Sequence, residues 1–223
     1  MGFIIILLII GALIYFKMKQ DPKWLKSRLK GKTDEQKRVI RYFLAEGCLA
    51  STISDEQYDQ MVADKLAEFN FKKKALDKHG LDEDQVQEIQ PVNFDGYVFD
   101  KAYSKKGKDG YWRSSKYQVS WIFFGESQVY FYQYTFDMDE TSKRESTEEY
   151  FYKDIVNFST ASETEEVVTE WDSDGNVKSR GTVERNVFQL IVPGDKIKCS
   201  IQLNDETENI IKGMKNKLRE KKA

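Results

Sequence analysis

The pattern of hydrophobic and polar positions divides the chain into an apolar start, a helical part and a strand-rich part. Residues 3–16 carry no charged side chain, and nearly all of them are Ile, Leu, Phe or Ala. With their flanks, residues 1–18 would form a helix of about 27 Å, close to the roughly 30 Å hydrocarbon layer of a bilayer. We therefore expect a transmembrane anchor over residues 1–18.

Two alternatives to a permanent anchor fit this segment less well. A signal peptide needs a basic stretch before its apolar core and a small-residue cleavage site after it, and neither is present around residues 3–16. A buried core helix normally shows a polar face to water, which this segment lacks. The chain is therefore predicted to be a single-pass membrane protein.

The anchor is followed by a basic juxtamembrane segment over residues 19–32, in which Trp24, Leu25 and Leu29 are expected to lie on the lipid surface. Residues 17–32 hold seven basic side chains and one acidic side chain, a net charge of +6. Because basic flanks stay on the cytoplasmic side, we expect the N-terminus outside and the body in the cytoplasm. These charges could set topology alone or also bind anionic headgroups, and both roles stay open. The candidate headgroup contacts are Lys17, Lys19, Lys23, Lys26, Arg28, Lys30 and Lys32.

Residues 33–91 show helical periodicity and are predicted to form a helical hairpin. Thr33 and Ser54 each begin a capping-box sequence, and apolar residues then recur at three- and four-residue spacing. The second helix is expected to run unbroken to His79-Gly80, a sequence typical of a helix C-terminal cap. A pair of helices has little core of its own, so its apolar stripe should pack on the following strands or on a second copy of the chain.

Over residues 92–223 the period changes to two, which predicts antiparallel strands followed by a C-terminal amphipathic helix. Residues 117–123 and 129–136 alternate in polarity, and Gly125-Glu-Ser between them predicts a tight hairpin. The fold class is therefore α+β, with an antiparallel β-barrel or sandwich closed by a helix. Two further turns are predicted at SKKGKDG (104–110) and DSDGN (172–176). Other short strands are expected at 94–103, 149–152, 155–160, 165–171, 187–192 and 197–203.

Eleven aromatic residues fall within residues 111–136. Aromatic side chains bury large areas, so most of them are expected in a core or between domains. Two adjacent strands of a small open barrel cannot hide both of their faces, which leaves a partner-binding face or an apolar pocket as the alternative for some. The candidates for such a face are Phe124, Phe131, Tyr130, Tyr132 and Tyr134.

One motif and the order of the elements carry a resemblance to a known superfold. Seven antiparallel strands followed by one amphipathic helix is the layout of the pleckstrin-homology (PH) superfold. The stretch Tyr152-Lys-Asp-Ile-Val-Asn-Phe158 resembles the aromatic-x-Asp-Ile-x-x-apolar strand of bacterial PH-like domains. The resemblance covers about residues 93–221. It implies a lipid-, peptide- or assembly-binding module, generally without catalytic activity.

Composition and motifs give no support to catalysis or to nucleic-acid binding. The chain has a net charge of −2, so the part after the basic segment carries −8 and is a poor match for phosphates. Cys48 and Cys199 provide no disulfide framework and fit a reducing compartment. His79 is the only histidine, and a structural role at a helix end is favoured over a base or a metal ligand. We expect no catalytic residue, no cofactor and no metal.

The sequence therefore predicts an adaptor or scaffold that is anchored in the membrane, faces the cytoplasm and binds a protein partner. A second copy of the chain is included among the partners, which would make a homo-oligomer. The alternative is a module that binds a lipid or another small hydrophobic ligand among its aromatic strands.

Overall fold

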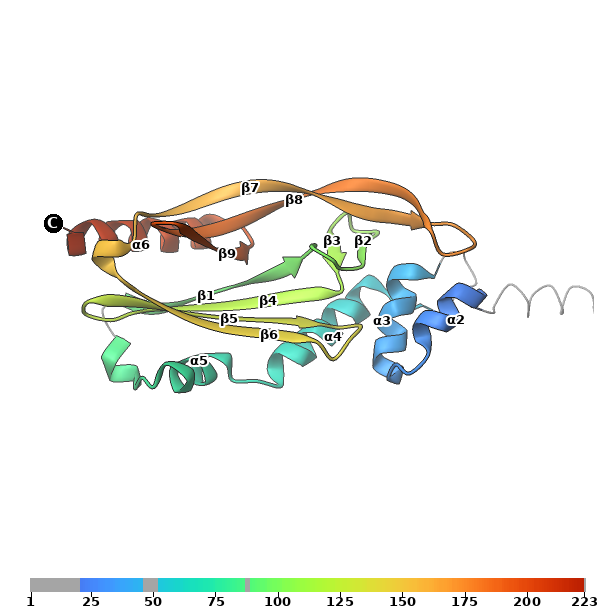
Figure 1. Ribbon diagram of the computed structural model, residues 1–223, viewed down its shortest axis with the longest axis horizontal. Coiled ribbons are helices and arrows are strands. Elements are labelled where there is room, and N and C mark those ends of the chain that lie inside the picture. The colour runs from blue at the N-terminus through green and yellow to red at the C-terminus, as the bar shows by residue number, and fades with distance from the viewer. Residues whose placement is uncertain (1–20, 46–51, 87–88, 223) are drawn as a thin grey trace, which may run out of the picture.

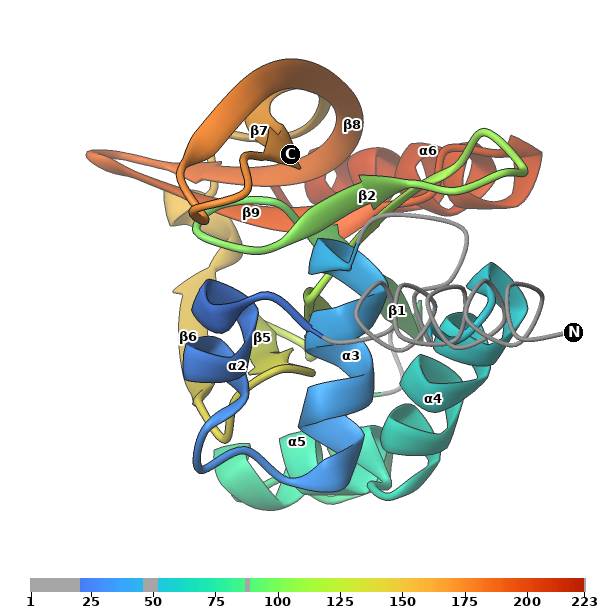
Figure 2. The ribbon, with the colours of Figure 1, turned by 90° about the vertical axis from the view of Figure 1, so that its right-hand side faces the viewer.

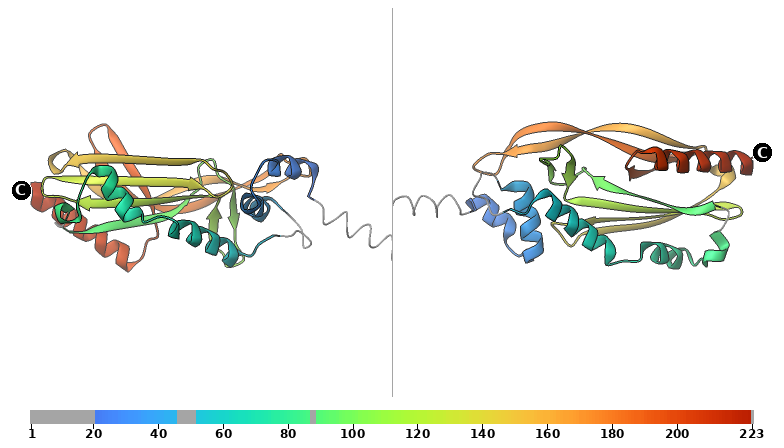
Figure 3. Two further views of the ribbon diagram at one scale, coloured as in Figure 1. Left: turned by 90° about the horizontal axis from the view of Figure 1, so that it is seen from below. Right: turned by 180° about the vertical axis from the view of Figure 1, so that it is seen from behind.

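The chain folds into three layers that are visible side-on in the computed structural model (Figure 1). The structure describes residues 21–45, 52–86 and 89–222. Helices form one outer layer, a four-stranded antiparallel sheet forms the middle, and a three-stranded antiparallel sheet with the C-terminal helix forms the other outer layer. The molecule is elongated, with α2 at one end and the C-terminus at the opposite end (Figures 1 and 3). The predicted α+β class is thus confirmed, with antiparallel sheets and a C-terminal helix.

The helical layer begins with the two predicted caps. Thr33 and Ser54 each accept a hydrogen bond from the backbone N–H three residues on, and both capping boxes are complete. The predicted unbroken second helix was wrong, because Asn70 caps a new helix by accepting a hydrogen bond from the Lys73 N–H at 3.0 Å. The expected cap at Gly80 is present, with a left-handed φ of 65°. The elements are α2 (Lys23–Leu29), α3 (Asp34–Leu44), α4 (Asp55–Ala67), α5 (Phe71–His79) and the 3-10 turn η1 (Glu83–Val86).

The four-stranded sheet has the order β1-β4-β5-β6, and all its pairings are antiparallel. The hairpin predicted at Gly125 joins β4 to β5, closed by the bond from the Gly125 N–H to the Gln128 carbonyl at 3.0 Å. The turn predicted over 104–110 lies within a separate two-stranded hairpin, β2–β3. This hairpin follows β1 and precedes β4 in the sequence. The bounds are β1 (Ile89–Val98), β2 (Ser104–Lys106), β3 (Trp112–Ser114), β4 (Lys116–Phe124), β5 (Gln128–Asp137) and β6 (Lys143–Phe151).

The second sheet has the order β7-β8-β9 and is dominated by one long hairpin. The short strands expected at 155–160 and 165–171 form a single 15-residue strand, which the turn at 172–176 joins to a 16-residue partner. The motif Tyr152–Phe158 begins as a 3-10 turn rather than as a strand. The bounds are η2 (Tyr152–Asp154), β7 (Asn157–Trp171), β8 (Val177–Val192), β9 (Asp195–Ile201) and α6 (Asp205–Lys222).

The middle sheet is buried on both faces, which accounts for the aromatic density of β4 and β5. On one face, Phe123 and Tyr132 pack with α3, α4 and α5, so the helices bury their apolar stripe on the strands as predicted. On the other face, Phe124 and Phe131 pack with the second sheet and α6. Neighbouring residues of a strand point to opposite faces, so covering both faces buries both sets. Figure 3 shows α4 and α5 from below, lying across the strands.

The predicted anchor and the predicted lipid-facing strip on α2 have different outcomes. The anchor predicted over residues 1–18 lies outside the described residues, and within the described ranges no helix is both long and apolar enough to cross a membrane. The lipid-facing strip was wrong in part, because Leu25 and Leu29 are buried in the protein core. The apolar side of α2 packs on α3 and the core beneath it, which removes that surface from water. The division at residues 33–91 and 92–223 stays a prediction.

Alanine substitutions at two neighbouring residues test whether both faces of the sheet are core. Phe131 and Tyr132 point to opposite sides of β5, and neither side chain is more than 1% exposed. Each substitution, Phe131→Ala or Tyr132→Ala, should lower the free energy of unfolding by about 3–5 kcal/mol, because each leaves a cavity in one core. Denaturant unfolding of the detergent-solubilised chain measures this change.

Tyr111→Ala is the matched control, because the Tyr111 side chain is 73% exposed. Its effect should stay within about 0.5 kcal/mol. A loss as small as this at Phe131 or Tyr132 would show that the corresponding face is not a packed core.

Candidate functional site

A groove of about 910 Å³ lies where α4, the β2–β3 hairpin, β1 and the β8–β9 pair meet. Its volume is in the range of about 300–1,000 Å³ typical of ligand sites in proteins. The lining is more apolar than polar, and Tyr111 stands on its rim as a largely exposed aromatic side chain. The main apolar lining residues are Val62, Leu66, Phe99, Trp112, Ile201 and Leu203.

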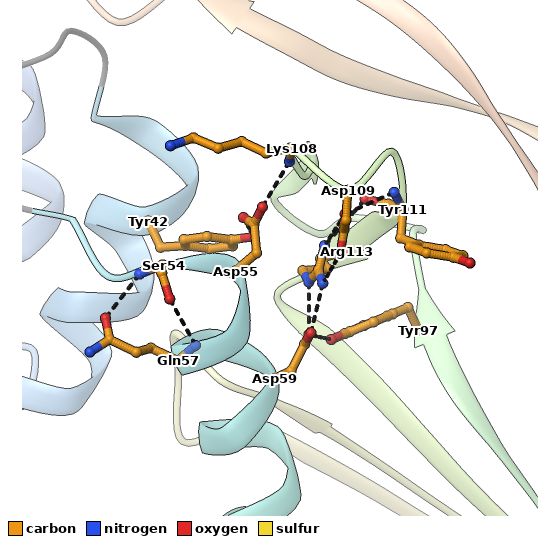
Figure 4. A network of polar contacts seen from close by, with 10 residues as sticks. All are labelled: Tyr42, Ser54, Asp55, Gln57, Asp59, Tyr97, Lys108, Asp109, Tyr111 and Arg113. Carbon is orange, nitrogen blue, oxygen red and sulfur yellow. Dashed lines mark hydrogen bonds and ion pairs between the residues drawn. The ribbon is translucent and has the colours of Figure 1, made fainter.

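Arg113 fixes one wall of the groove by bridging α4 and the β2–β3 turn (Figure 4). Its Nε and Nη2 donate to Asp59 Oδ1 and Oδ2 at 2.7 and 2.6 Å, a bidentate pair. Its Nη1 and Nη2 donate to Asp109 Oδ1 and Oδ2 at 3.0 and 2.7 Å. The Arg113 side chain is only 6% exposed. The hydrogen bond from Arg113 lowers the pKa of Asp109 to about 2.

A second carboxylate, Asp55, ties the same turn to the start of α4. Its Oδ1 accepts from Tyr42 Oη at 2.7 Å, and its Oδ2 accepts from the Lys108 N–H at 2.8 Å. Burial raises the pKa of Asp55, but the hydrogen bonds from Tyr42 and Lys108 lower it by more. The pKa of Asp55 therefore lies below its ordinary value of 3.8. Asp55 therefore holds α3, α4 and the β2–β3 turn together as an ionised acceptor (Figure 4).

Tyr97 is one of the tyrosines that line the groove, and it connects the groove to the buried Tyr58. Tyr97 on β1 donates to Asp59 Oδ1 at 3.1 Å and stacks on Tyr58, with ring centroids 6.4 Å apart. Tyr58 in turn donates to the Ser114 carbonyl at 2.6 Å. Burial, and for Tyr97 also the nearby Asp59 carboxylate, raises the pKa of both phenols, so both remain neutral donors.

The opposite wall is made by β8 and β9. Arg185 forms ion pairs with Glu165 at 2.6 Å and with Glu163 at 3.6 Å, and its Nη1 donates to Ser200 Oγ at 3.1 Å. This wall comes close to β1 at Gly96, where an added Cβ would lie 3.1 Å from the Ser200 Cβ. A glycine at this position lets the two strands approach each other at the edge of the groove.

The chemistry of the groove suits binding of another molecule. Its two guanidinium groups are each paired with carboxylates, and its apolar side chains are presented on fixed walls. Across residues 21–45, 52–86 and 89–222, no group of three or more His, Cys, Asp or Glu side chains could hold a metal ion. His79 lies elsewhere, with Nδ1 3.2 Å from Glu149 Oε1 and Nε2 3.2 Å from the Phe131 carbonyl. It joins the end of α5 to β5 and β6.

The predicted headgroup contacts divide into three groups. Lys17 and Lys19 lie outside the described residues, and Lys23, Lys26 and Lys30 are exposed on and just after α2. Arg28 and Lys32 instead contact the protein. The Lys32 Nζ donates to the Asp139 carbonyl at 3.0 Å, while Arg28 Nη1 donates to Tyr103 Oη at 2.8 Å.

Arg28 belongs to a cluster that we call the aromatic latch, made of Trp24, Arg28, Tyr103 and Trp171. The guanidinium lies 4.6 Å from the Trp171 ring centroid and 5.7 Å from each of the other two rings. Trp24 stacks on Trp171 with ring centroids 6.4 Å apart. The latch fixes α2 to the tip of the β7–β8 hairpin, at the end of the molecule that faces the viewer in Figure 2.

The aromatic residues predicted as a partner face do not form one. Phe124, Phe131, Tyr132 and Tyr134 are buried, and Tyr130 is partly buried against the His79 ring. The alternative of an open face on these strands was wrong, because the helices cover one face and the second sheet with α6 covers the other. The core alternative for these residues is the one that the structure shows.

The residues that build the groove wall were missed by sequence reasoning. Asp55 and Asp59 are four residues apart, which places two carboxylates on one face of a predicted helix. Arg113 follows a predicted turn. These were the available signals, but Arg113 and Asp59 are 54 positions apart, and no local pattern joins them.

No protein-family model, curated protein or solved structure matches this chain. The chemistry of the groove is therefore defined by its own residues, above all the Arg113 wall, the tyrosines and the apolar lining.

The Arg113–Asp109 contact predicts a specific dependence of stability on pH. The pKa of Asp109 falls from its ordinary 3.8 to about 2 on folding, so its stabilising contribution is present above 3.8 and is lost as the pH falls towards 2. The stability difference between the wild type and Asp109→Asn should therefore shrink between pH 5 and pH 2. Denaturant midpoints of the two proteins at several pH values measure it, and a constant difference would contradict the contact.

Gly175→Ala tests the aromatic latch. Gly175 has a φ of 85°, and an added Cβ would lie 2.8 Å from the Trp24 ring. We expect about 1–2 kcal/mol of backbone strain together with release of α2, seen as faster tryptic cleavage after Lys26 and Lys30. Gly194→Ala is the matched control, because Gly194 has a similar φ of 82° with nothing within 4 Å of the added atom. Equal cleavage in both variants would show that Trp24 does not hold the helix.

Proposed function

We propose that the chain is a single-pass, membrane-anchored adaptor whose body faces the cytoplasm and binds a protein partner in the groove beside α4. The observation that carries this proposal is the groove itself, with its apolar lining and its wall fixed by Arg113, Asp59 and Asp109. A site that is already ordered before binding loses little conformational entropy when a partner enters it.

Anchoring supplies the mechanism of the proposed adaptor. A membrane helix over residues 1–18 would restrict the body to a thin layer beside the bilayer, which raises the effective concentration of a partner held in the same layer. The exposed lysines of α2 support a cytoplasmic orientation, since basic flanks are retained on that side. The protein then acts by bringing its partner to the membrane.

The chemistry of the groove suggests what the partner segment carries. Arg113 and Arg185 are each already paired with two carboxylates, so an acidic segment would have to displace existing ion pairs. Leu66, Trp112 and Leu203 can bury apolar side chains of a ligand. We therefore expect a segment with apolar side chains and neutral or basic flanks. A second copy of the chain is one source of such a segment.

The order of the strands supports the proposed relationship to PH-like domains. A four-stranded antiparallel sheet is followed by a three-stranded one and by a C-terminal helix, with β2–β3 as an addition between the first two strands of the four-stranded sheet. Tyr152, Ile155 and Phe158 of the motif point into the core. Binding and assembly are the usual roles of PH-like domains, which fits an adaptor.

The alternative, a module for a lipid or small hydrophobic ligand, has less support. It requires room among the aromatic strands. Phe158 instead packs against Phe124 and Phe188, with ring centroids 6.4 and 5.8 Å apart, and all three side chains are fully buried. A ligand there would have to displace core side chains.

Site-specific photo-cross-linking in the native membrane tests the adaptor proposal. A photoreactive residue at Tyr111, on the groove rim, should give one dominant protein adduct that mass spectrometry identifies. Leu203→Asp in the same molecule should reduce that adduct at least about tenfold, because it places a charge in the apolar groove. Leu203 is exposed, so the fold should be retained.

The control places the photoreactive residue at Val177, which is also exposed but lies on β8 near the hairpin tip. It should not give the same adduct. Equal labelling from both positions, or labelling that Leu203→Asp leaves unchanged, would remove the groove as the partner site. Recovery of a lipid adduct alone would favour the small-ligand alternative.

A further inference from the structure

The end of the molecule opposite α2 exposes two large apolar side chains on one short turn. Within η2 and its flanks, Tyr152 and Ile155 point into the core and are buried, whereas Phe151 is 51% exposed and Val156 is 56% exposed. They are two of six large exposed hydrophobic side chains among the described residues, and they lie only five positions apart. Exposed apolar side chains gathered in this way typically mark an interaction surface.

Positive charge is concentrated at the same end. The last turns of α6 lie against η2, and Lys221 Nζ is 5.8 Å from the Tyr152 ring centroid. Lys153 Nζ is 5.5 Å from the Phe151 ring centroid. Residues 212–222 with 153–154 hold seven basic and two acidic side chains, a net charge of +5, which Glu126, Glu148 and Glu149 of the adjoining β4–β5 turn and β6 reduce to +2. We call Phe151, Lys153, Val156, Arg219, Lys221 and Lys222 the distal tip.

Structural roles account for only part of this arrangement. Basic residues in the last turn of α6 complement the helix dipole, which explains Arg219, Lys221 and Lys222. The dipole does not explain Lys153. Alternation along the chain can turn Phe151 and Val156 away from the core, but it does not require these exposed positions to be apolar. An apolar pair beside basic side chains is instead the pattern of segments that enter a membrane interface.

We propose that the distal tip binds an anionic membrane surface. Phe151 and Val156 would enter the interface between headgroups and acyl chains, while the basic side chains of the tip contact the headgroups. The tip lies at one end of an elongated molecule (Figure 1), and the groove described above is lined by residues outside η2 and α6.

The position of the tip determines which membrane it can reach. It lies at the opposite end of the molecule from α2 (Figure 1). If residues 1–18 anchor the chain, as the proposed function holds, the body presents the tip away from its own membrane. The inference rests on that anchor, and it predicts that the protein tethers a second, anionic bilayer.

A vesicle-capture assay tests the tip. The full chain is reconstituted into phosphatidylcholine vesicles, and labelled vesicles with or without phosphatidylserine are then added and co-sedimented. The wild type should capture the phosphatidylserine vesicles, and rising salt should weaken capture. Lys153→Glu/Lys222→Glu should reduce capture about tenfold or more, and Phe151→Ser should reduce it several-fold. All three residues are exposed, so the variants should fold.

Lys143→Glu/Arg144→Glu is the matched control, because it makes the same change of charge at two exposed residues at the end of β6 opposite Phe151. It should leave capture unchanged. The proposal is overturned if this control weakens capture as much as the tip variants do, if the tip variants capture like the wild type, or if neutral vesicles are captured equally. The proposal is also overturned if neutral vesicles coated with an acidic peptide are captured as well as phosphatidylserine vesicles, because an acidic protein surface would then serve as ligand equally well.

The anchor proposal and the tip proposal can be tested separately. Flotation of the reconstituted protein with its own phosphatidylcholine vesicles reports the anchor independently. If the protein does not float, the anchor proposal is wrong, and the same variants are compared for direct flotation with phosphatidylserine vesicles. The tip proposal makes the same prediction there, with binding lost in Lys153→Glu/Lys222→Glu and retained in Lys143→Glu/Arg144→Glu.

Discussion

Burial of the four-stranded sheet on both faces is the constraint on which the rest of the structure depends. Side chains alternate along β4 and β5, so Phe123 and Tyr132 need cover on one side and Phe124 and Phe131 on the other. Each such side chain is worth about 1.5–3 kcal/mol when it is fully buried. Helices supply one cover, and the second sheet with α6 supplies the other. The helical layer therefore completes a core that the strands cannot close alone.

The groove is a consequence of this layering. At the edge strand β1, α4 covers one face of the sheet and β8–β9 cover the other, so two layers flank the same edge. Gly96 allows β9 to approach closely there, and the β2–β3 hairpin closes the end. The Arg113 contacts with Asp59 and Asp109 keep the hairpin and α4 together. The proposed binding surface thus lies where the layers meet and not on the aromatic strands themselves.

Sequence patterns predicted what is local. The caps at Thr33 and Ser54, the Gly125 hairpin, the turn at 172–176 and the C-terminal helix all follow from a few neighbouring residues. What they missed depends on distant contacts. The long β7–β8 hairpin has an exposed, polar outer half, held by cross-strand pairs such as Arg180–Glu166, and polar alternation alone is a weak strand signal. The groove joins segments over 50 positions apart. The alternation of side chains along a strand also does not indicate that a second sheet packs on the other face.

The β2–β3 hairpin connects the groove to the membrane-proximal end. At its base, Tyr103 and Ser115 are joined by two hydrogen bonds of 2.9 and 3.1 Å, and Tyr103 is also part of the aromatic latch that holds Arg28. At its turn, Asp109 binds Arg113 beside the groove. Each strand has only three residues, so the hairpin has little freedom to bend between these points. If the proposed partner moves the turn, these contacts would transmit the movement to α2, and by reciprocity the orientation of α2 would change the affinity for that partner by the same factor.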